Sequence, residues 1–320
     1  MWGKSHAIDR VRGKDDRMER VLLIVNPKAG QGDPAEKILE ALQVFSAAGV
    51  PVTVWITQAA GDAARMAREH GCEYTMTACL GGDGTLHELL EGLADAGYAG
   101  RVGYIPAGST NDFAYSLGIP AEDPTHAAKI MISGRPFACD LGDFNGRQFV
   151  YVAAFGLFTE VSYQTDQSLK NILGHLAYVL AGARSLFSIK AYPMNIMADD
   201  RSVDGSFIYG MVCNTRSVGG FRDIAGEAVA LDDGLLEVVL IRDPEGSLQA
   251  IDRIINAITA RRPDEPYVYY MKSSRLTIDT EVPVPWTLDG ERGGEHSAVC
   301  IKDRPRAFRI MVEREDQTTE

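Results

Sequence analysis

Residues 20–135 alternate between short apolar runs and longer segments whose apolar residues recur at helical spacing. The apolar runs predict strands at 21–25, 50–57, 74–80 and 101–106. The periodic segments between them predict helices at 33–49, 61–71 and 85–95. Strands that alternate with helices build βαβ units with a parallel sheet. This part of the chain is therefore predicted to be a doubly wound α/β domain.

The second part of the chain has a different pattern. Residues 139–155 form two β-like runs joined by Asn145-Gly146, a dipeptide that favours tight hairpin turns. Further β-like runs follow at 193–214, 234–242, 273–291 and 308–313. Helical interruptions are expected near 164–187 and 246–261. These patterns predict an antiparallel, sandwich-like β domain.

The expected organisation therefore has four parts. An N-terminal tail (1–19) precedes the α/β domain (20–136), and the β-rich domain (137–315) is followed by a short polar tail (316–320).

Charge and cysteine usage narrow the functional classes. A net charge of −12 argues against a nucleic-acid binder, which needs a basic face. Five scattered cysteines without a CxxC pair indicate a reducing compartment such as the cytoplasm, and no disulfide framework or zinc site. The chain is expected to bind no nucleic acid and to be cytoplasmic.

Membrane contact is expected to be peripheral. The first 20 residues contain no apolar signal segment. The most apolar stretch, 171–189, is interrupted by His175 and Arg184, which argues against a transmembrane helix. The basic residues of the N-terminal tail suggest an anchoring role that liposome flotation of a truncated chain would test.

Two glycine-rich loops follow predicted strands. The first is "VNPKAGQG" (25–32), which also fits an ordinary Asn-Pro turn, and the second is "GGDGT" (81–85). Thr85 and Glu88 fit a helix capping box, but that does not explain the glycines around Asp83. Both loops lie where open α/β sheets bind ligands and where helix N-termini meet phosphates. Together they predict a nucleotide site.

Three further motifs contain carboxylates, and each has a structural alternative. Asp112 in "PAGSTNDFA" (106–114) is either a helix cap or a site residue. Asp233 in "LDDG" (231–234) belongs to a turn or to a Mg²⁺ or Ca²⁺ site. Asp289 and Glu291 in "DGE" are two residues apart, so extended backbone places them on one face.

In this order the five motifs resemble the diacylglycerol kinase catalytic-domain family, including soluble bacterial lipid kinases and their sphingosine and ceramide kinase relatives. The resemblance covers about residues 20–315 and implies an active site in the cleft between an α/β domain and a β-rich domain. It implies ATP contacts at Asn26, Pro27, Lys28, Ala29, Gly30, Thr57, Gly82, Asp83, Gly84, Thr85, Leu86, His87, Glu88 and Ser109.

The resemblance also implies residue roles. Asp83 and Asp112 would be acidic residues at the phosphates, and Asp289 would be the general base with Glu291 beside it. A structural Mg²⁺ would be held by the Asp233 side chain and the carbonyls of Ala230 and Leu235. Two positions depart from the family: His87 replaces the usual Asn, and Ser109 replaces a common Thr.

The expected activity is ATP- and Mg²⁺-dependent phosphoryl transfer to a hydroxyl of diacylglycerol or a similar lipid at a membrane surface. Two alternatives remain open: a kinase for a soluble acceptor, in the manner of NAD kinase, and a non-catalytic lipid- or nucleotide-binding regulator. The sequence leaves open which lipid is used, and whether edges of the β-rich part pair to form a homodimer. It also leaves open whether Asp83 acts through Mg²⁺ or by fixing neighbouring hydrogen-bond donors.

Overall fold

The structure, a computed structural model, describes residues 19–30, 33–157, 190–199, 201–223, 225 and 229–314. The helix expected near 164–187, residues 1–18 of the expected N-terminal tail and the polar tail at 316–320 lie outside the described residues.

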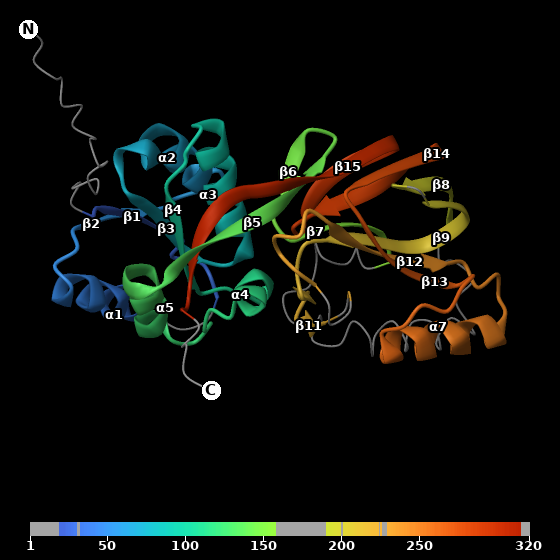
Figure 1. Ribbon diagram of the computed structural model, residues 1–320, viewed down its shortest axis with the longest axis horizontal. Helices are drawn as coiled ribbons and strands as arrows, with labels where there is room; N and C mark the ends of the chain where they lie inside the picture. Colours follow the sequence, from blue (N-terminus) through green and yellow to red (C-terminus); the bar gives the residue numbers. More distant parts are fainter. Residues whose placement is uncertain are drawn as a thin grey trace, which may run out of the picture.

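The first part of the chain is the predicted doubly wound α/β domain. Its parallel strands lie in the order β2-β1-β3-β4. Helices α1 and α5 pack together, as do α2 and α3, and the two pairs cover opposite sides of the sheet (Figure 1). The elements are β1 (Val21–Val25), α1 (Pro34–Ala47), β2 (Val52–Ile56), α2 (Asp62–His70), η1 (Gly71–Glu73), β3 (Met76–Gly81), α3 (Asp83–Asp95), β4 (Arg101–Pro106), α4 (Asp112–Leu117) and α5 (Pro124–Ser133).

The apolar runs of the sequence become the centre of this sheet. Every residue of β1 and β3 is buried, as expected for parallel strands covered by helices on both faces. Helix α1 begins where its sequence predicts, because the Asp33 side chain accepts a hydrogen bond from the backbone N–H of Ala35 and Pro34 occupies the first turn.

The second part of the chain is built mainly from antiparallel strands. Its elements are β5 (Arg135–Phe144), β6 (Arg147–Phe149), β7 (Val152–Gly156), β8 (Tyr192–Ala198), β9 (Arg201–Cys213), β10 (Ser217–Val218), β11 (Phe221–Arg222), β12 (Leu236–Arg242), α7 (Leu248–Ala260), β13 (Val268–Ser273), β14 (Arg275–Leu288) and β15 (Glu291–Val312). The long strands β9 and β14 both pair with β7 and with β8, which closes the sheet upon itself. Phe144, Phe155 and Trp286 pack together in the enclosed core.

Two local predictions in this part are confirmed. Asn145 and Gly146 form the two-residue turn between β5 and β6, with φ of +50° and +88°. The helix expected near 246–261 is α7.

Among the described helices, none combines the length and apolarity needed to cross a bilayer.

Strand β15 joins the two parts of the molecule. It pairs along its length with β14 and β5, and near its C-terminal end Ile310 pairs with Val102 of β4. In Figure 1 the red β15 and the green β5 run side by side from one part to the other. The boundary expected between residues 136 and 137 therefore falls inside β5, in a sheet that is continuous across both parts.

Candidate active site

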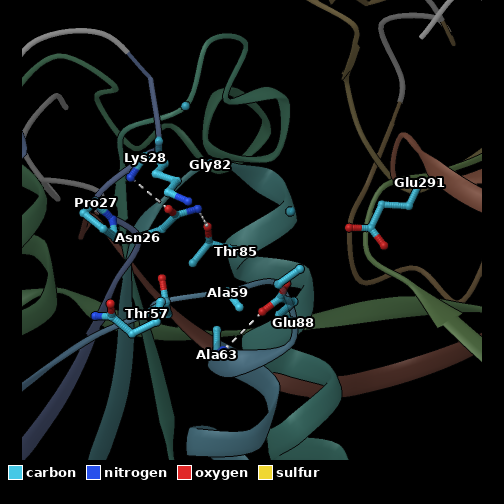
Figure 2. Close-up of a pocket in the computed structure, with 15 residues that line it drawn as sticks. Asn26, Pro27, Lys28, Thr57, Ala59, Ala63, Gly82, Thr85, Glu88 and Glu291 are labelled. Carbon is cyan, nitrogen blue, oxygen red and sulfur yellow. Dashed lines mark hydrogen bonds between the residues drawn. The ribbon is translucent and has the colours of Figure 1, made fainter. Parts of the chain in front are cut away.

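A pocket of about 340 Å³ lies at the C-terminal ends of β1, β2 and β3. Most of its lining comes from the α/β domain, and Glu291 of β15 faces the rest across the opening (Figure 2). Its lining residues are Asn26, Pro27, Lys28, Ala29, Thr57, Gln58, Ala59, Ala60, Ala63, Gly82, Gly84, Thr85, Glu88, Gly108 and Glu291.

Ten of these residues were expected from sequence: Asn26, Pro27, Lys28, Ala29, Thr57, Gly82, Gly84, Thr85, Glu88 and Glu291. Gly30, Asp83, Leu86, His87, Ser109, Asp112 and Asp289 are not in the lining. Leu86, for example, is fully buried in the core, whereas Ser109 is exposed outside the lining. After β2, sequence reasoning found Thr57 but missed Gln58, Ala59 and Ala60, although this loop reaches the same sheet edge as its two neighbours.

Asn26 connects the first two glycine-rich loops. Its side-chain nitrogen donates a hydrogen bond to Thr85 Oγ1 at 3.0 Å, and its side-chain oxygen accepts one from the backbone N–H of Lys28 at 3.0 Å (Figure 2). One amide therefore holds the shape of the first loop and fixes that loop to the start of α3.

Several glycines of these motifs are needed for packing between loops. A Cβ on Gly30, which has φ of +71°, would lie 1.8 Å from the carbonyl oxygen of Ala107. A Cβ on Gly108 would lie 2.7 Å from the Cα of Gly82. Gly84 differs, because a Cβ there would meet nothing within 4 Å, and it lines the pocket. Close approach of three loops thus explains most of the glycines.

Glu88 does not form the expected capping box with Thr85. Helix α3 begins at Asp83, two residues before the expected start, with Gly82 as its N-cap and no capping side chain. Thr85 accepts the bond from Asn26, and the Glu88 carboxylate accepts hydrogen bonds from the N–H groups of Gly61 (2.9 Å) and Ala63 (3.2 Å) at the start of α2. The first turn of α3 is therefore left uncapped by side chains at the edge of the pocket.

Asp83 turns away from the pocket into the protein. Its carboxylate accepts hydrogen bonds from the backbone N–H groups of Asp112 (3.0 Å) and Phe113 (3.2 Å) at the start of α4. The hydroxyls of Tyr104 and Thr110 donate to it as well, at 3.3 and 3.5 Å. Burial, with a further contribution from the Asp112 charge, raises the pKa of Asp83 to about 6. Of the two roles left open for Asp83, the geometry supports fixing neighbouring donors.

Asp112 connects α4 to the second part of the chain. Its buried carboxylate accepts hydrogen bonds from Ser217 Oγ at 2.5 Å and from the N–H groups of Gly219 and Gly220 at 2.7 and 2.9 Å. Asp112 therefore anchors the β10–β11 hairpin.

Asp289 lies in the turn between β14 and β15, with φ of +50°. Its carboxylate accepts hydrogen bonds from the consecutive N–H groups of Val150 (2.6 Å), Tyr151 (3.0 Å) and Val152 (2.9 Å). A fourth partner is Nδ1 of His87 on α3, at 2.7 Å from Oδ2. The Asp289–His87 contact joins the α/β domain to the β-rich part beside the pocket.

The loop expected to hold a structural Mg²⁺ is a compact turn. Asp233 accepts a hydrogen bond from the N–H of Leu235 at 3.1 Å and pairs with the Lys272 ammonium at 2.9 Å. Nearby, both carboxylate oxygens of Asp303 are buried and make no hydrogen bond within the described residues. Burial and the charges of Asp140 and Asp233 raise the pKa of Asp303 to about 7.

This surplus of carboxylate charge fits a divalent cation at the loop. Over the described ranges, however, no three Asp, Glu, His or Cys side chains converge closely enough to hold a metal by themselves. A cation here would therefore need oxygen ligands other than these side chains.

A pocket at the carboxyl edge of a parallel sheet, beside an uncapped helix N-terminus, is typical of phosphate- and nucleotide-binding α/β proteins. Comparison with known proteins makes this more specific. Residues 20–144 match the diacylglycerol kinase catalytic domain, and residues 152–312 match the YegS C-terminal NAD kinase beta sandwich-like domain. The chain belongs to the diacylglycerol kinase catalytic-domain family, and it is a lipid kinase.

Individual relatives support the same assignment. A diacylglycerol kinase from Bacillus subtilis (strain 168) is 34% identical over 279 residues, covering 87% of this chain and 91% of the relative. A diacylglycerol kinase from Staphylococcus carnosus (strain TM300) is 31% identical, with coverage of 87% and 90%. A crystal structure from Bacillus anthracis str. Sterne, of a protein assigned as a diacylglycerol kinase, superposes with a TM-score of 0.78 at 28% identity, covering 92% of this chain and 97% of that one.

Proposed function

We propose that this lipid kinase transfers the γ-phosphoryl group of ATP to a hydroxyl of diacylglycerol or a closely similar lipid. The observation that carries the proposal is the pocket between the "NPKAG" and "GGDGT" loops, with Glu291 facing it from β15. Backbone N–H groups at the uncapped start of α3 suit phosphates, and the expected nucleotide residues Asn26 and Thr85 lie beside them.

The carboxylates of this region have separate roles in the proposal. Asp83 and Asp112 position the loops around the phosphates through their backbone contacts. Asp289 would be the general base that accepts the proton of the lipid hydroxyl, with Glu291 beside it. Mg²⁺ bound with ATP would neutralise charge on the phosphates. A structural Mg²⁺ would be held by the Asp233 side chain and the carbonyls of Ala230 and Leu235.

Diacylglycerol is favoured as the acceptor because the relatives that share most of this chain are called diacylglycerol kinases. Such a substrate resides in a membrane, so the protein would contact the membrane surface peripherally. The scattered cysteines favour the cytoplasm as its compartment. Residues 173–189 could form an amphipathic lipid entrance or an ordinary packed helix, and they lie outside the described residues.

The direct test is incubation of the protein with γ-labelled ATP, Mg²⁺ and a panel of acceptors in mixed micelles, followed by chromatography of the product. The panel contains diacylglycerol, phosphatidylglycerol, a sphingoid base and an isoprenoid alcohol, with NAD as the soluble acceptor. Labelled phosphatidate is the expected product. Label in phosphorylated NAD alone would contradict the lipid proposal, and label in no product would support a non-catalytic regulator.

A matched pair of variants tests the role of Asp289. Asp289→Ala is expected to lower turnover by ~10² to 10⁴ while ATP affinity stays within a few-fold of wild type. Asp279→Ala is the control, because Asp279 is an exposed carboxylate on β14, the strand that leads into the Asp289 turn. Turnover of Asp289→Ala within a few-fold of the control would remove Asp289 from the mechanism.

A further inference from the structure

A second pocket, of about 470 Å³, lies where the end of α4 meets the start of β5 and the C-terminal end of β15. The residue before β10 and the loop before β12 complete its wall. It shares no lining residue with the pocket at the carboxyl edge of the parallel sheet. The two pockets are therefore separate sites.

Three arginines from distant parts of the sequence line this second pocket: Arg135, Arg216 and Arg314. Arg135 begins β5 and pairs in register with Val312 at the end of β15. Arg314 follows β15, and its Nε donates a hydrogen bond to the carbonyl of Gly134 at 3.3 Å. Two of the arginines are thus at the same end of the β5–β15 pair, and Arg216 reaches the pocket from the segment between β9 and β10.

Hydrogen bonds within the protein leave donors of these guanidinium groups unused. Each guanidinium has five N–H donors. Arg216 donates from Nη2 to Asp223 at 3.1 Å, and its buried Nε has no partner in the described part of the chain. Among the same residues, Arg314 forms a hydrogen bond only through Nε. Planar guanidinium groups with unused donors suit an anion that offers several acceptor oxygens.

The carboxylates of this pocket do not neutralise the three arginines. Asp232 and Glu313 also line it, and both are exposed. Glu313 already has a cationic partner, because one of its oxygens lies 3.0 Å from Nε2 of His126. The lining thus has three positive and two negative side chains, in a chain whose net charge is −12. A positive pocket on an acidic protein indicates a local site for anions.

Much of the remaining wall is apolar. Leu117 and Phe137 are partly buried beside the arginines, and the Arg135 guanidinium lies 5.6 Å from the centre of the Phe137 ring. The volume is in the range of small-molecule pockets, which is more than a bare inorganic anion needs. The ligand that fits this lining has an anionic group and an apolar part.

We propose that this pocket binds a phosphomonoester through the guanidinium groups of Arg135, Arg216 and Arg314. Leu117 and Phe137 contact the apolar part of the ligand. A phosphomonoester carries between one and a half and two negative charges at neutral pH by the usual estimate of roughly −1.5 to −2, and it offers three strong acceptor oxygens. Both a lipid with a phosphomonoester headgroup and a soluble glycerol phosphate have this chemistry. The site goes beyond the proposed kinase function and does not depend on it.

The position of the pocket indicates what a bound phosphomonoester would do. Ser116, at the end of α4, lies in its wall. Ser116 Oγ lies 2.7 Å from Thr215 Oγ1 and accepts a hydrogen bond from the N–H of Arg216 at 2.9 Å. A ligand held by Arg216 and by the β5–β15 pair would fasten the segment before β10 to that pair. Binding is therefore expected to raise the melting temperature.

Calorimetric titration of the full chain tests the site. The probes are glycerol 3-phosphate and dihexanoyl phosphatidate, each without ATP. Arg314→Ala is expected to weaken binding by about tenfold to a hundredfold, because it removes charge-assisted hydrogen bonds to the phosphate. Arg309→Ala is the matched control, since Arg309 is also exposed on β15 but does not line the pocket. Phosphate can enter the first pocket too, so the difference between these variants identifies the site.

Arg216→Gln is a second variant on another part of the wall. The glutamine amide can still donate to Asp223, but the guanidinium is lost. The same loss of affinity, and loss of the rise in melting temperature, are expected. Tighter binding of dihexanoyl phosphatidate than of glycerol 3-phosphate would identify a lipid headgroup as the ligand, and equal affinity would identify a soluble phosphomonoester.

Two results would overturn the proposal. One is the absence of binding of either probe to the wild-type protein. The other is equal affinity of the wild type, Arg314→Ala and Arg216→Gln, which would place the bound probe elsewhere. Because these titrations involve no turnover, failure of the kinase function would be a separate result, seen as the absence of a labelled product in the assay with ATP.

Discussion

The Asp83 carboxylate lies 3.0 Å from the backbone nitrogen of Asp112 and accepts its N–H hydrogen bond. Asp112 in turn binds Ser217, Gly219 and Gly220 through its own carboxylate. The two aspartates thus form a continuous connection from the "GGDGT" loop, through the start of α4, to the β10–β11 hairpin. Substitutions along this connection are therefore expected to lower the free energy of unfolding more than they lower the rate of phosphoryl transfer.

Asp83→Asn is expected to destabilise the protein by about 1–3 kcal/mol. All four partners of the carboxylate are hydrogen-bond donors, so an amide NH₂ would face a donor and leave a buried group unsatisfied. Urea denaturation would measure the loss. Asp95→Asn serves as the control, because Asp95 lies exposed at the end of the same helix. Equal stability of the two variants would contradict the packing role of Asp83.

Ser217→Ala is expected to lower the free energy of unfolding by about 1.5–3 kcal/mol, the range for a hydrogen bond to a charged group. Two N–H donors would remain on Asp112, so the fold should survive. Limited proteolysis should show faster cleavage near the β10–β11 hairpin than in wild type. The comparison variant is Ser133→Ala, which loses only an exposed bond to the carbonyl of Lys129.

Two glycines of the loops are expected to respond differently to alanine. Gly108→Ala would place a Cβ 2.7 Å from the Cα of Gly82, so we expect a stability loss of about 1–3 kcal/mol. Gly84→Ala meets no atom within 4 Å and should leave the melting temperature unchanged or slightly higher, because alanine favours a helix. Since Gly84 lines the pocket, this variant should instead weaken ATP binding, which calorimetric titration would measure. A loss of stability in Gly84→Ala, together with unchanged stability and weaker ATP binding in Gly108→Ala, would contradict the packing role of Gly108 and the pocket role of Gly84.

Glu237 is expected to make stability fall as pH rises. Its side chain is buried, and burial raises its pKa to about 7 although the Lys272 ammonium lies 3.1 Å away. Between about pH 4.5 and 7 the native state therefore retains a proton that the unfolded chain has released. The free energy of unfolding then falls with increasing pH, by up to about 1.4 kcal/mol per pH unit from this group.

Glu237→Gln should remove that part of the pH dependence. Denaturation midpoints measured from pH 5 to pH 8 without divalent cations should fall less steeply in the variant than in wild type. Some slope should remain, because the pKa of Asp303 is raised into the same range. Parallel profiles for variant and wild type would show that Glu237 is ionised in the native state across this range.

Much of the fold could be predicted from local patterns. The buried runs that become β1 and β3, the Asp33-Pro34 start of α1 and the Asn145-Gly146 turn depend on residues close together in the chain. The "NPKAG" and "GGDGT" loops could also be placed at one sheet edge, because each follows a parallel strand. The loop after β2 has no such motif; Thr57 was expected there through the family resemblance, but the part played by Gln58, Ala59 and Ala60 became apparent only in the structure.

The sequence by itself determined the two-part architecture, the family and most of the pocket lining, because strand periodicity and glycine-rich turns are local signals. Only the tertiary structure decided what the carboxylates contact. The backbone partners of Asp83, Asp112 and Asp289 lie 29, 107 and 137 residues away in the sequence, at the nearest N–H groups of Asp112, Gly219 and Val152. From the local sequence, a carboxylate beside glycines is predicted to contact phosphate or metal. The folded chain instead places backbone N–H donors from distant residues against it. The contact between His87 and Asp289 could not be predicted from local patterns either, because the two residues are 202 positions apart in the sequence.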